Sequence, residues 1–162
     1  MIRKAVQKDI IQASEVLEKV KNHMLGEGID QWDQEYPNNT VLHQDIDEEK
    51  AFIYEDQGVL LAYMALNEKC DAEYNDLTWN TKIPFLVIHR LYVKPTAQGK
   101  GISSKMIRYA EQYAHAHKYQ SIRFDAFSLN ERANAVYLKK GYNLVGTVSF
   151  RKGVFNCYEK SI

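Results

Sequence analysis

Two glycines in the second half of the chain are placed to bind an anion. They lie in the segment from Gln98 to Lys105, Gln-Gly-Lys-Gly-Ile-Ser-Ser-Lys, between an apolar run that ends at Val93 and a helix-like run that begins near Gly101. Glycine lets the backbone approach a ligand closely, and the first N–H groups of a helix lack intrahelical acceptors and point outward. Because that end of a helix is also its positive end, we expect this segment to bind a diphosphate.

Spacing separates the segment from two other phosphate-binding motifs. A P-loop has Gly-Lys followed by Ser or Thr, whereas Lys100 is followed by Gly101. A dinucleotide-binding turn needs Gly-x-Gly-x-x-Gly directly after a strand, but Ser104 takes the place of the third glycine and residues 94–98 intervene. Asp125, near the end of the next strand-like run, leaves a nicotinamide-binding function open as a distant alternative.

A second group of residues falls on one face of a later helix. Asn130, Ala133, Asn134 and Tyr137 follow the helical spacing i, i+3, i+4 and i+7. A tyrosine on such a face usually packs in the core. It can also supply a proton, because a phenol with a pKa of about 10 is protonated at neutral pH. The spacing alone leaves both interpretations open.

The apolar pattern predicts the elements that hold these two groups. Residues 84–93 suit a central strand, residues 121–127 alternate as another strand, and an amphipathic helix after Gly101 lies between them. The glycine segment then falls at the C-terminal end of the first strand, where ligands bind in α/β sheets. Ser128 with Glu131 predicts the start of the next helix.

The remaining pattern predicts one more helix and several short strands. They are a strand at residues 2–6, a helix from 9 to 26, a hairpin of 51–55 with 59–66, and closing strands at 142–150 and 154–160.

Both polar segments resemble signatures of one known family. Residues 91–103 are similar to Gln/Arg-x-x-Gly-x-Gly/Ala after a strand that ends in Val. Residues 130–142 are similar to Asn-x-x-Ala-x-x-x-Tyr followed by Gly-Phe or Gly-Tyr, at the expected distance from the first signature. The chain therefore resembles the GNAT superfamily of acyl-CoA-dependent N-acetyltransferases. Ser103 stands where this family usually has Gly or Ala, but a serine is small and can itself donate to a phosphate.

The resemblance implies a fold and a cofactor. The fold is α/β (α+β), a single GNAT-like domain over residues 1–162, with a mixed, mostly antiparallel sheet of about six to seven strands flanked by about four helices. The sheet is expected to splay in the middle, after Val93, to admit the pantetheine arm of acetyl-CoA. The residues implied in cofactor binding are Leu91, Tyr92, Val93, Gln98, Gly99, Lys100, Gly101, Ile102, Ser103, Ser104, Asn130 and Tyr137.

The resemblance also implies roles in catalysis. An acceptor amine attacks the thioester directly, and Tyr137 protonates the CoA thiolate, a group whose pKa of about 8.5 makes it leave more easily when a proton donor meets it. His89 is the leading candidate for the base, because histidine titrates in the right range and period-2 alternation places it on the face of Leu91 and Val93. A histidine that is merely hydrogen-bonded in a core strand, with ordered water as the base, is the alternative.

An acidic, aromatic segment after the first helix is the candidate acceptor site. Residues 27–37 carry acids and two aromatic residues but no Lys or Arg, which suits an ammonium group through charge and cation–π contact. We expect Trp32, Asp33 and Tyr36 to bind the substrate, and a solvated loop that these two aromatic residues pin to the domain is the alternative.

Composition and charge narrow the partners. A chain of 162 residues, 45% hydrophobic and 26% charged, with zero net charge, is expected to be globular and not to bind nucleic acid. Residues 1–81 have a net charge of −10 and residues 82–162 one of +10, so the half with the glycine segment suits a polyanion such as coenzyme A. No apolar run reaches the roughly 18 residues of a membrane span, so we expect a cytoplasmic protein with no membrane partner. The spacing of Cys and His predicts no metal site, and the sequence is compatible with a homodimer.

Together these features predict an enzyme that transfers the acetyl group of acetyl-CoA to a primary amine of a small molecule or a peptide. A non-catalytic acyl-CoA-binding sensor or interaction module is the alternative from another functional class. The sequence does not identify the acceptor amine.

Overall fold

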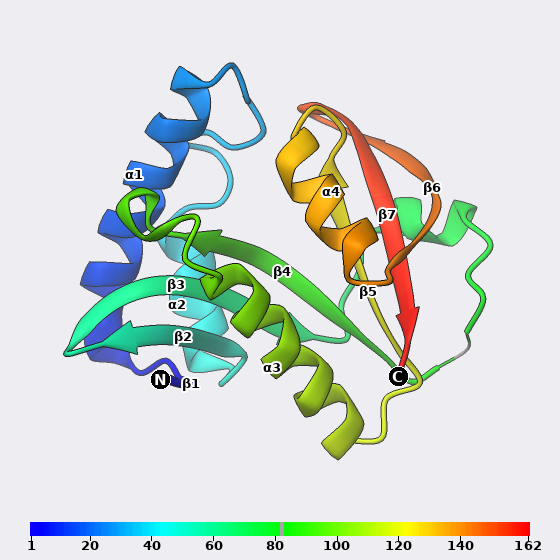
Figure 1. Ribbon diagram of the computed structural model, residues 1–162, viewed down its shortest axis with the longest axis horizontal. Helices are drawn as coiled ribbons and strands as arrows, with labels where there is room; N and C mark the ends of the chain where they lie inside the picture. The colour runs from blue at the N-terminus through cyan, green and yellow to red at the C-terminus, as the bar shows by residue number, and fades with distance from the viewer. Residues whose placement is uncertain (82) are drawn as a thin grey trace. The chain divides into compact units, whose positions relative to one another are not determined.

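The computed structural model describes residues 1–81 and 83–162. The chain divides into two compact units, one made of residues 1–66 and 89–110 and the other of residues 67–88 and 111–162. The described residues form a mixed sheet of seven strands in the order β1-β2-β3-β4-β5-β7-β6, with four α-helices, as the sequence predicts. Figure 1 follows these elements along the chain by colour.

Unit 1 contains most of the N-terminal half. Its elements are β1 (Ile2–Lys4), α1 (Ile10–Gly26), α2 (Asn39–Asp47), β2 (Ala51–Asp56), nearly all of β3 (Val59–Asn67), the end of β4 (Phe85–Val93) and the start of α3 (Ile102–Ala116). The hairpin β2–β3 is antiparallel and β1 adds to its edge, pairing Arg3 with Ile53.

The core of unit 1 forms where the apolar face of α1 meets the sheet. Leu17 and Val20 of α1 belong to one buried cluster with Ile53 of β2. Tyr63 of β3 stacks on Tyr92 of β4 with ring centroids 5.1 Å apart. Helical spacing in α1 and alternation in the strands place these residues on facing surfaces, as the sequence predicts.

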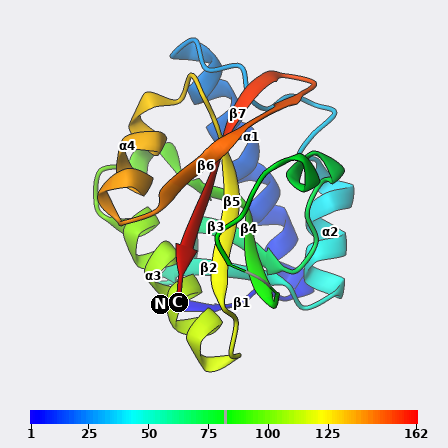
Figure 2. The same cartoon turned by 90° about the vertical axis from the view of Figure 1, so that its right-hand side faces the viewer.

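Unit 2 contains the C-terminal strands. Its elements are the start of β4, the 3₁₀ helix η2 (Ala72–Asp76), the end of α3, β5 (Ser121–Phe127), α4 (Glu131–Lys139), β6 (Asn143–Phe150) and β7 (Gly153–Ser161). β5 pairs with β7 along its whole length, β6 pairs with the other edge of β7, and both pairs are antiparallel (Figure 2).

The parallel pairing of β4 with β5 is short. It joins Phe85 to Ser121 and ends at the pair of Val87 with Arg123, so the next residues of both strands, Ile88 and Phe124, are unpaired with each other. The pairing therefore ends before Val93, the residue after which the sheet is expected to open. From Phe124 onward, no residue described for unit 2 pairs with β5 on its β4 side.

The start of α4 also differs from the prediction. Its N-cap is Asn130, whose Oδ1 accepts the N–H of Ala133 at 3.2 Å, and not Ser128. The N–H of Ser128 instead donates to the carbonyl of Val154 at 3.0 Å. Ser and Asn are both good caps, so residue type alone does not decide where the helix begins.

None of the helices in the described part of the chain is both long and apolar enough to cross a bilayer.

Candidate active site

The predicted diphosphate segment is a loop with unsatisfied backbone donors. It joins β4 to α3 through the 3₁₀ helix η3 (Pro95–Ala97). Gly99 and Gly101 have φ of +77° and +76°, and a Cβ added to either would meet nothing within 4 Å. The left-handed backbone, and not crowding, is therefore what requires glycine.

The first N–H in this stretch to find an acceptor is that of Lys105, which donates to the carbonyl of Gly101 at 3.1 Å. Among the described residues, no acceptor is found for the N–H groups from Gly99 to Ser104. Successive N–H groups at the positive end of a helix satisfy an anion. The donors of this stretch, here called the N–H cradle (residues 99–104), therefore fit a diphosphate.

Neighbouring residues hold the N–H cradle in place. The Gln98 side chain donates to the carbonyl of Val93 at 3.1 Å, which closes the loop between them. The Tyr92 ring is buried and its hydroxyl donates to the carbonyl of Ala13 at 2.9 Å, whereas Leu91 is half-buried. The side chains of Gln98 and Tyr92 thus have structural partners of their own.

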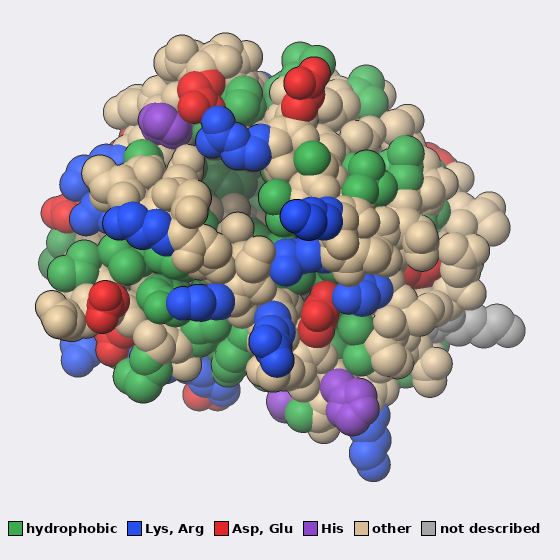
Figure 3. Space-filling model, viewed as in Figure 1, with side chains coloured by type: hydrophobic (Ala, Val, Ile, Leu, Met, Phe, Trp, Pro, Cys, Tyr) green, Lys and Arg blue, Asp and Glu red, His purple; other side chains and the backbone are tan. Residues whose placement is uncertain are grey.

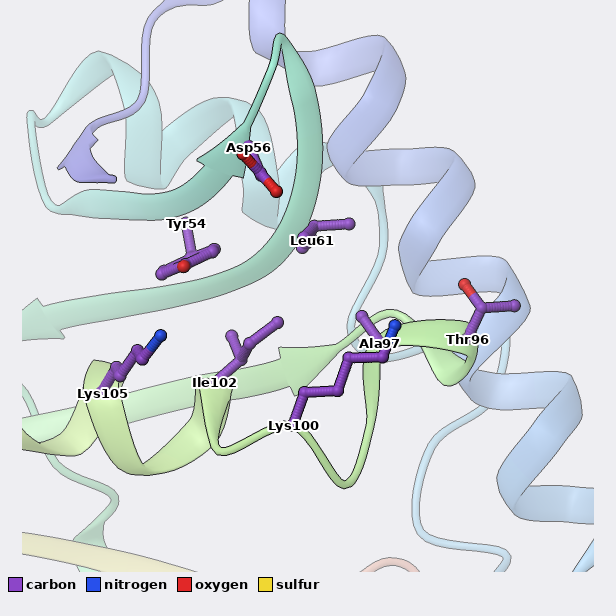
Figure 4. A pocket seen from close by; sticks show the side chains of 8 residues that line it. All are labelled: Tyr54, Asp56, Leu61, Thr96, Ala97, Lys100, Ile102 and Lys105. Carbon is purple, nitrogen blue, oxygen red and sulfur yellow. The ribbon is translucent and has the colours of Figure 1, made fainter.

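A basic pocket adjoins the N-terminus of α3 (Figure 4). It has a volume of about 240 Å³, with Lys100 and Lys105 on one side and Tyr54 and Asp56 of β2 on the other. The Nζ of Lys105 lies 5.5 Å from the centroid of the Tyr54 ring. Figure 3 shows several Lys and Arg side chains, and fewer Asp and Glu, on the face of the molecule that Figure 1 presents.

An arginine interrupts β4 beside the predicted base. Arg90 has φ of +52°, and its guanidinium donates to Asp45 of α2 at 2.8 Å and to the Tyr36 hydroxyl at 2.9 Å. A left-handed residue breaks the alternation of a strand. The expectation that alternation puts His89 on the face of Leu91 and Val93 is therefore wrong in its premise, and His89 as the base stays a prediction. His89 itself is half-buried.

The predicted acceptor segment is an ordered turn. Asp33 Oδ1 accepts the N–H groups of Glu35 at 3.0 Å and Tyr36 at 3.3 Å. Trp32 lies edge-on to Tyr92, with ring centroids 6.2 Å apart. Tyr36 is 40% exposed. The turn is thus pinned to β4 by Trp32 and by the bond from Arg90 to Tyr36, while Tyr36 stays partly exposed.

Tyr137 of α4 packs against the sheet of unit 2 and keeps its hydroxyl accessible. Its ring lies edge-on to Phe124 of β5, with centroids 4.5 Å apart, and 5.8 Å from the ring of Tyr158. The structure gives the hydroxyl no partner among the described residues, in which no side-chain oxygen or nitrogen is both fully buried and unpaired, so the hydroxyl must reach solvent. Burial of the ring and the charge of Asp125 raise the pKa of Tyr137 to about 12. The phenol therefore holds its proton at neutral pH.

Asn134, one turn before Tyr137, fixes the helix. Its Nδ2 donates to the carbonyls of Phe127 at 2.9 Å and Asn130 at 2.8 Å. Its Oδ1 accepts from Asn156 at 3.0 Å and from the Tyr158 hydroxyl at 2.6 Å. All the usual bonding capacity of an amide is used, so Asn134 positions α4 on β5 and β7.

The predicted residues fall into two groups. Unit 1 holds the acceptor turn, His89, and the cofactor residues from Leu91 to Ser104, whereas unit 2 holds Asn130 and Tyr137. The sequence does not single out Arg90, which bonds Tyr36 of the acceptor turn, or Asp125, whose charge acts on Tyr137. The only signal for Arg90 was a charge within an apolar strand, and Asp125 was noted only for the nicotinamide alternative.

Comparison with known families decides between the alternatives. The family described as Acetyltransferase (GNAT) family matches residues 15–142, which include both signatures. The chain belongs to the GNAT family. It is therefore an acetyltransferase, and the cofactor of the family is acetyl-CoA, as expected from the sequence. No match was found among curated proteins.

Solved structures show that the GNAT fold extends over the whole chain. A GNAT acetyltransferase from Streptococcus agalactiae is 24% identical with a TM-score of 0.87, and the match covers 100% of this chain and 95% of that one. One from Listeria monocytogenes is 22% identical with a TM-score of 0.80, covering 100% and 94%. The PaiA N-acetyltransferase from Thermoplasma acidophilum, solved in complex with coenzyme A, is 20% identical with a TM-score of 0.75, covering 100% and 98%.

Proposed function

We propose that this GNAT protein acts as one catalytic domain over residues 1–162 and transfers the acetyl group of acetyl-CoA to a primary amine of a small molecule or a peptide. The observation that carries the proposal is the open Tyr137 hydroxyl, which is held by ring packing, protonated at neutral pH and free of protein partners among the described residues.

The binding step rests on the N–H cradle. Gly99 to Ser104 would hold the diphosphate of acetyl-CoA with main-chain donors, and the lysines of the basic pocket add positive charge nearby. Backbone groups of Leu91, Tyr92 and Val93 would bind the pantetheine arm and the acetyl carbonyl, with a backbone N–H near Val93 as the oxyanion donor. Asn130, which caps α4 with its Oδ1, would also contact the cofactor.

Proton transfer rests on Tyr137. When bound, acetyl-CoA supplies a thioester whose thiol leaves more easily if it is protonated as the C–S bond breaks. Tyr137 would donate that proton and regain one from solvent. The acidic turn with Trp32, Asp33 and Tyr36 would attract the ammonium form of the acceptor, and the partly exposed Tyr36 could add a cation–π contact.

Tyr137→Phe tests the proposal because it removes only the proton donor. We expect the single-turnover rate of thiol release, with acetyl-CoA and a panel of primary amines, to fall by about 10²-fold or more, as for loss of a general acid. The affinity for coenzyme A, measured by calorimetry, should stay unchanged, because the phenol makes no contribution to the N–H cradle.

Tyr142→Phe is the matched control. Tyr142 packs on the same Phe124 ring, with centroids 4.9 Å apart, but its hydroxyl is engaged by Glu111 at 3.2 Å. It should keep the single-turnover rate within about twofold. An unchanged single-turnover rate in Tyr137→Phe would refute the assigned role of the phenol.

A further inference from the structure

A half-buried carboxylate lies at the unpaired edge of β5. Asp125 follows Phe124, the residue on which Tyr137 packs, and its cross-strand partner on β7 is Cys157. Within unit 2 the pairing of β5 with β4 ends at Arg123, so Asp125 lies just beyond the last paired residue. Burying a carboxylate among apolar strand residues costs free energy unless the carboxylate is hydrogen-bonded or paired.

One oxygen of Asp125 is held and the other is open. Oδ2 accepts the Tyr74 hydroxyl at 2.6 Å. The Tyr74 ring is buried against Trp79, with centroids 5.2 Å apart, and the Trp79 indole donates to the Tyr74 carbonyl at 2.9 Å. Oδ1 has no partner among the described residues, where no buried side-chain oxygen is left unpaired, so Oδ1 must reach solvent. Tyr74 thus fixes the carboxylate with one oxygen available.

The groups around Asp125 do not neutralise it. Arg123, two residues earlier on the same face, pairs with Glu159 at 3.2 Å. The nearby Asp71 is negative, and the thiol of Cys157 is uncharged because burial and Asp125 raise its pKa to about 12. Burial and Asp71 together raise the pKa of Asp125 to about 6, although the Tyr74 hydrogen bond lowers it. A carboxylate with a raised pKa is a stronger base than an ordinary one.

Asp125 of β5 and Tyr137 of α4 are both neighbours of Phe124. Tyr137 contacts Phe124, the immediate neighbour of Asp125, and the charge of Asp125 helps to raise the pKa of Tyr137. Alternation puts the side chains of Phe124 and Asp125 on opposite faces of β5. Burial raises both pKa values, that of Asp125 from 3.8 to about 6 and that of Tyr137 from 10.0 to about 12, so at neutral pH the carboxyl can accept a proton while the phenol still holds one.

We propose that Asp125 is the catalytic base, accepting at Oδ1 the proton that the acceptor amine loses as it attacks, with Tyr74 as its positioning residue. This inference rests on the proposed function. The bound ammonium first loses one proton to solvent, which frees the nitrogen lone pair. A second N–H bond then breaks and its proton passes to Oδ1, while the lone pair forms the new N–C bond. The C–S bond breaks, the sulfur keeps its electrons, and Tyr137 protonates it. Solvent then removes the proton from Asp125.

The test is the pH dependence of the chemical step. We would measure thiol release with saturating acetyl-CoA and the fastest amine among spermidine, lysine and a tripeptide with a free N-terminus. The parent protein should show an ascending limb near pH 6. Asp125→Asn should lose this limb and at least about 10²-fold in rate. His89→Gln should keep the limb, which separates the two candidate bases.

Two further variants move the limb in opposite directions. Tyr74→Phe removes a hydrogen bond that lowers the pKa of Asp125, so the limb should shift to higher pH. Asp71→Asn removes a negative charge that raises it, so the limb should shift to lower pH. A residue with only a structural role would change the rate without these two opposite shifts.

We expect Asp125→Asn to fold. Its amide oxygen can still accept the hydrogen bond of the Tyr74 hydroxyl, and the substitution removes a partly buried charge. Its melting temperature at pH 8 should equal or exceed that of the parent. The assignment is overturned if the folded Asp125→Asn keeps the limb and the rate, if His89→Gln abolishes the limb, or if the limb follows the acceptor's own pKa when two amines are compared. If no amine releases thiol from the parent, the proposed function fails and this inference with it.

Discussion

Asn134→Ala should destabilise the protein by an amount that its hydrogen bonds predict. The amide makes four bonds, two to backbone carbonyls and two to side chains of β7, and it is 8% exposed. At about 1 kcal/mol of net stability for each bond, their loss costs about 4 kcal/mol. Alanine favours a helix interior over asparagine by about 0.7 kcal/mol, so the expected loss is about 3 kcal/mol.

The assay is urea unfolding at equilibrium, followed by circular dichroism and tryptophan fluorescence. The free energy of unfolding in water comes from linear extrapolation, and the two probes must give the same transition for this number to be valid. Asn156→Ala is the matched control, because it removes only one of the four bonds and should cost about 1 kcal/mol.

The double variant isolates the bond between the two amides. Asn134→Ala should cost less by about 1 kcal/mol in the background of Asn156→Ala, because their shared bond is already absent. A loss below about 1 kcal/mol for Asn134→Ala alone would refute the hydrogen-bond reasoning. It would mean that water or rotated side chains satisfy the freed groups of β5 and β7.

Two further substitutions test the N–H cradle and the ion pair of unit 1. Gly101→Ala should cost about 1 kcal/mol for its positive φ and weaken coenzyme A binding about tenfold or more by calorimetry, because the Cβ stands beside the donors. Gly58→Ala, at φ +79° in the β2–β3 turn, should lose similar stability and keep its affinity. Asp45→Asn should cost about 3 kcal/mol in urea unfolding, because it leaves Arg90 charged, largely buried and uncompensated. Glu49→Gln, in an exposed ion pair at 3.8 Å, should cost under about 0.5 kcal/mol, and equal losses in these two variants would contradict the argument.

Much of the fold follows from patterns that extend over a whole element. The predicted strand at 121–127 coincides with β5, and the helix expected up to Gly26 ends there. The helix expected after Gly101 is α3, which begins at Ile102. In these segments the apolar period, the glycines and the caps favour the same structure, so local information suffices.

The structure differs from the prediction where contacts with residues distant in sequence affect the local conformation. Arg90 takes a left-handed conformation within β4, which its own sequence neighbourhood does not favour, because Asp45 and Tyr36 bind its guanidinium. The cap of α4 is Asn130, whereas Ser128 donates its N–H to the distant Val154 of β7. Neither partner can be inferred from local spacing.

The residues of the candidate site also differ in whether local sequence or distant contacts determine their role. The glycines and Tyr137 could be predicted because their spacing alone suits an anion and a helix face. Asp125 could not, because its place as a base depends on Tyr74, on Asp71 and on where the pairing of β4 ends. His89 was chosen by alternation, which the bend at Arg90 interrupts.

The N–H cradle has a consequence for how this protein can vary in sequence and in environment. Its donors are main-chain groups, which carry no titratable proton and belong to every residue type except proline. Substitutions of Lys100, Ile102, Ser103 or Ser104 can therefore alter charge and packing while the donors themselves remain. Acidification can protonate a carboxylate such as Asp125 and leave these donors unchanged for as long as the chain stays folded. If activity falls in mild acid, the turnover rate should therefore fall while the affinity for coenzyme A is retained.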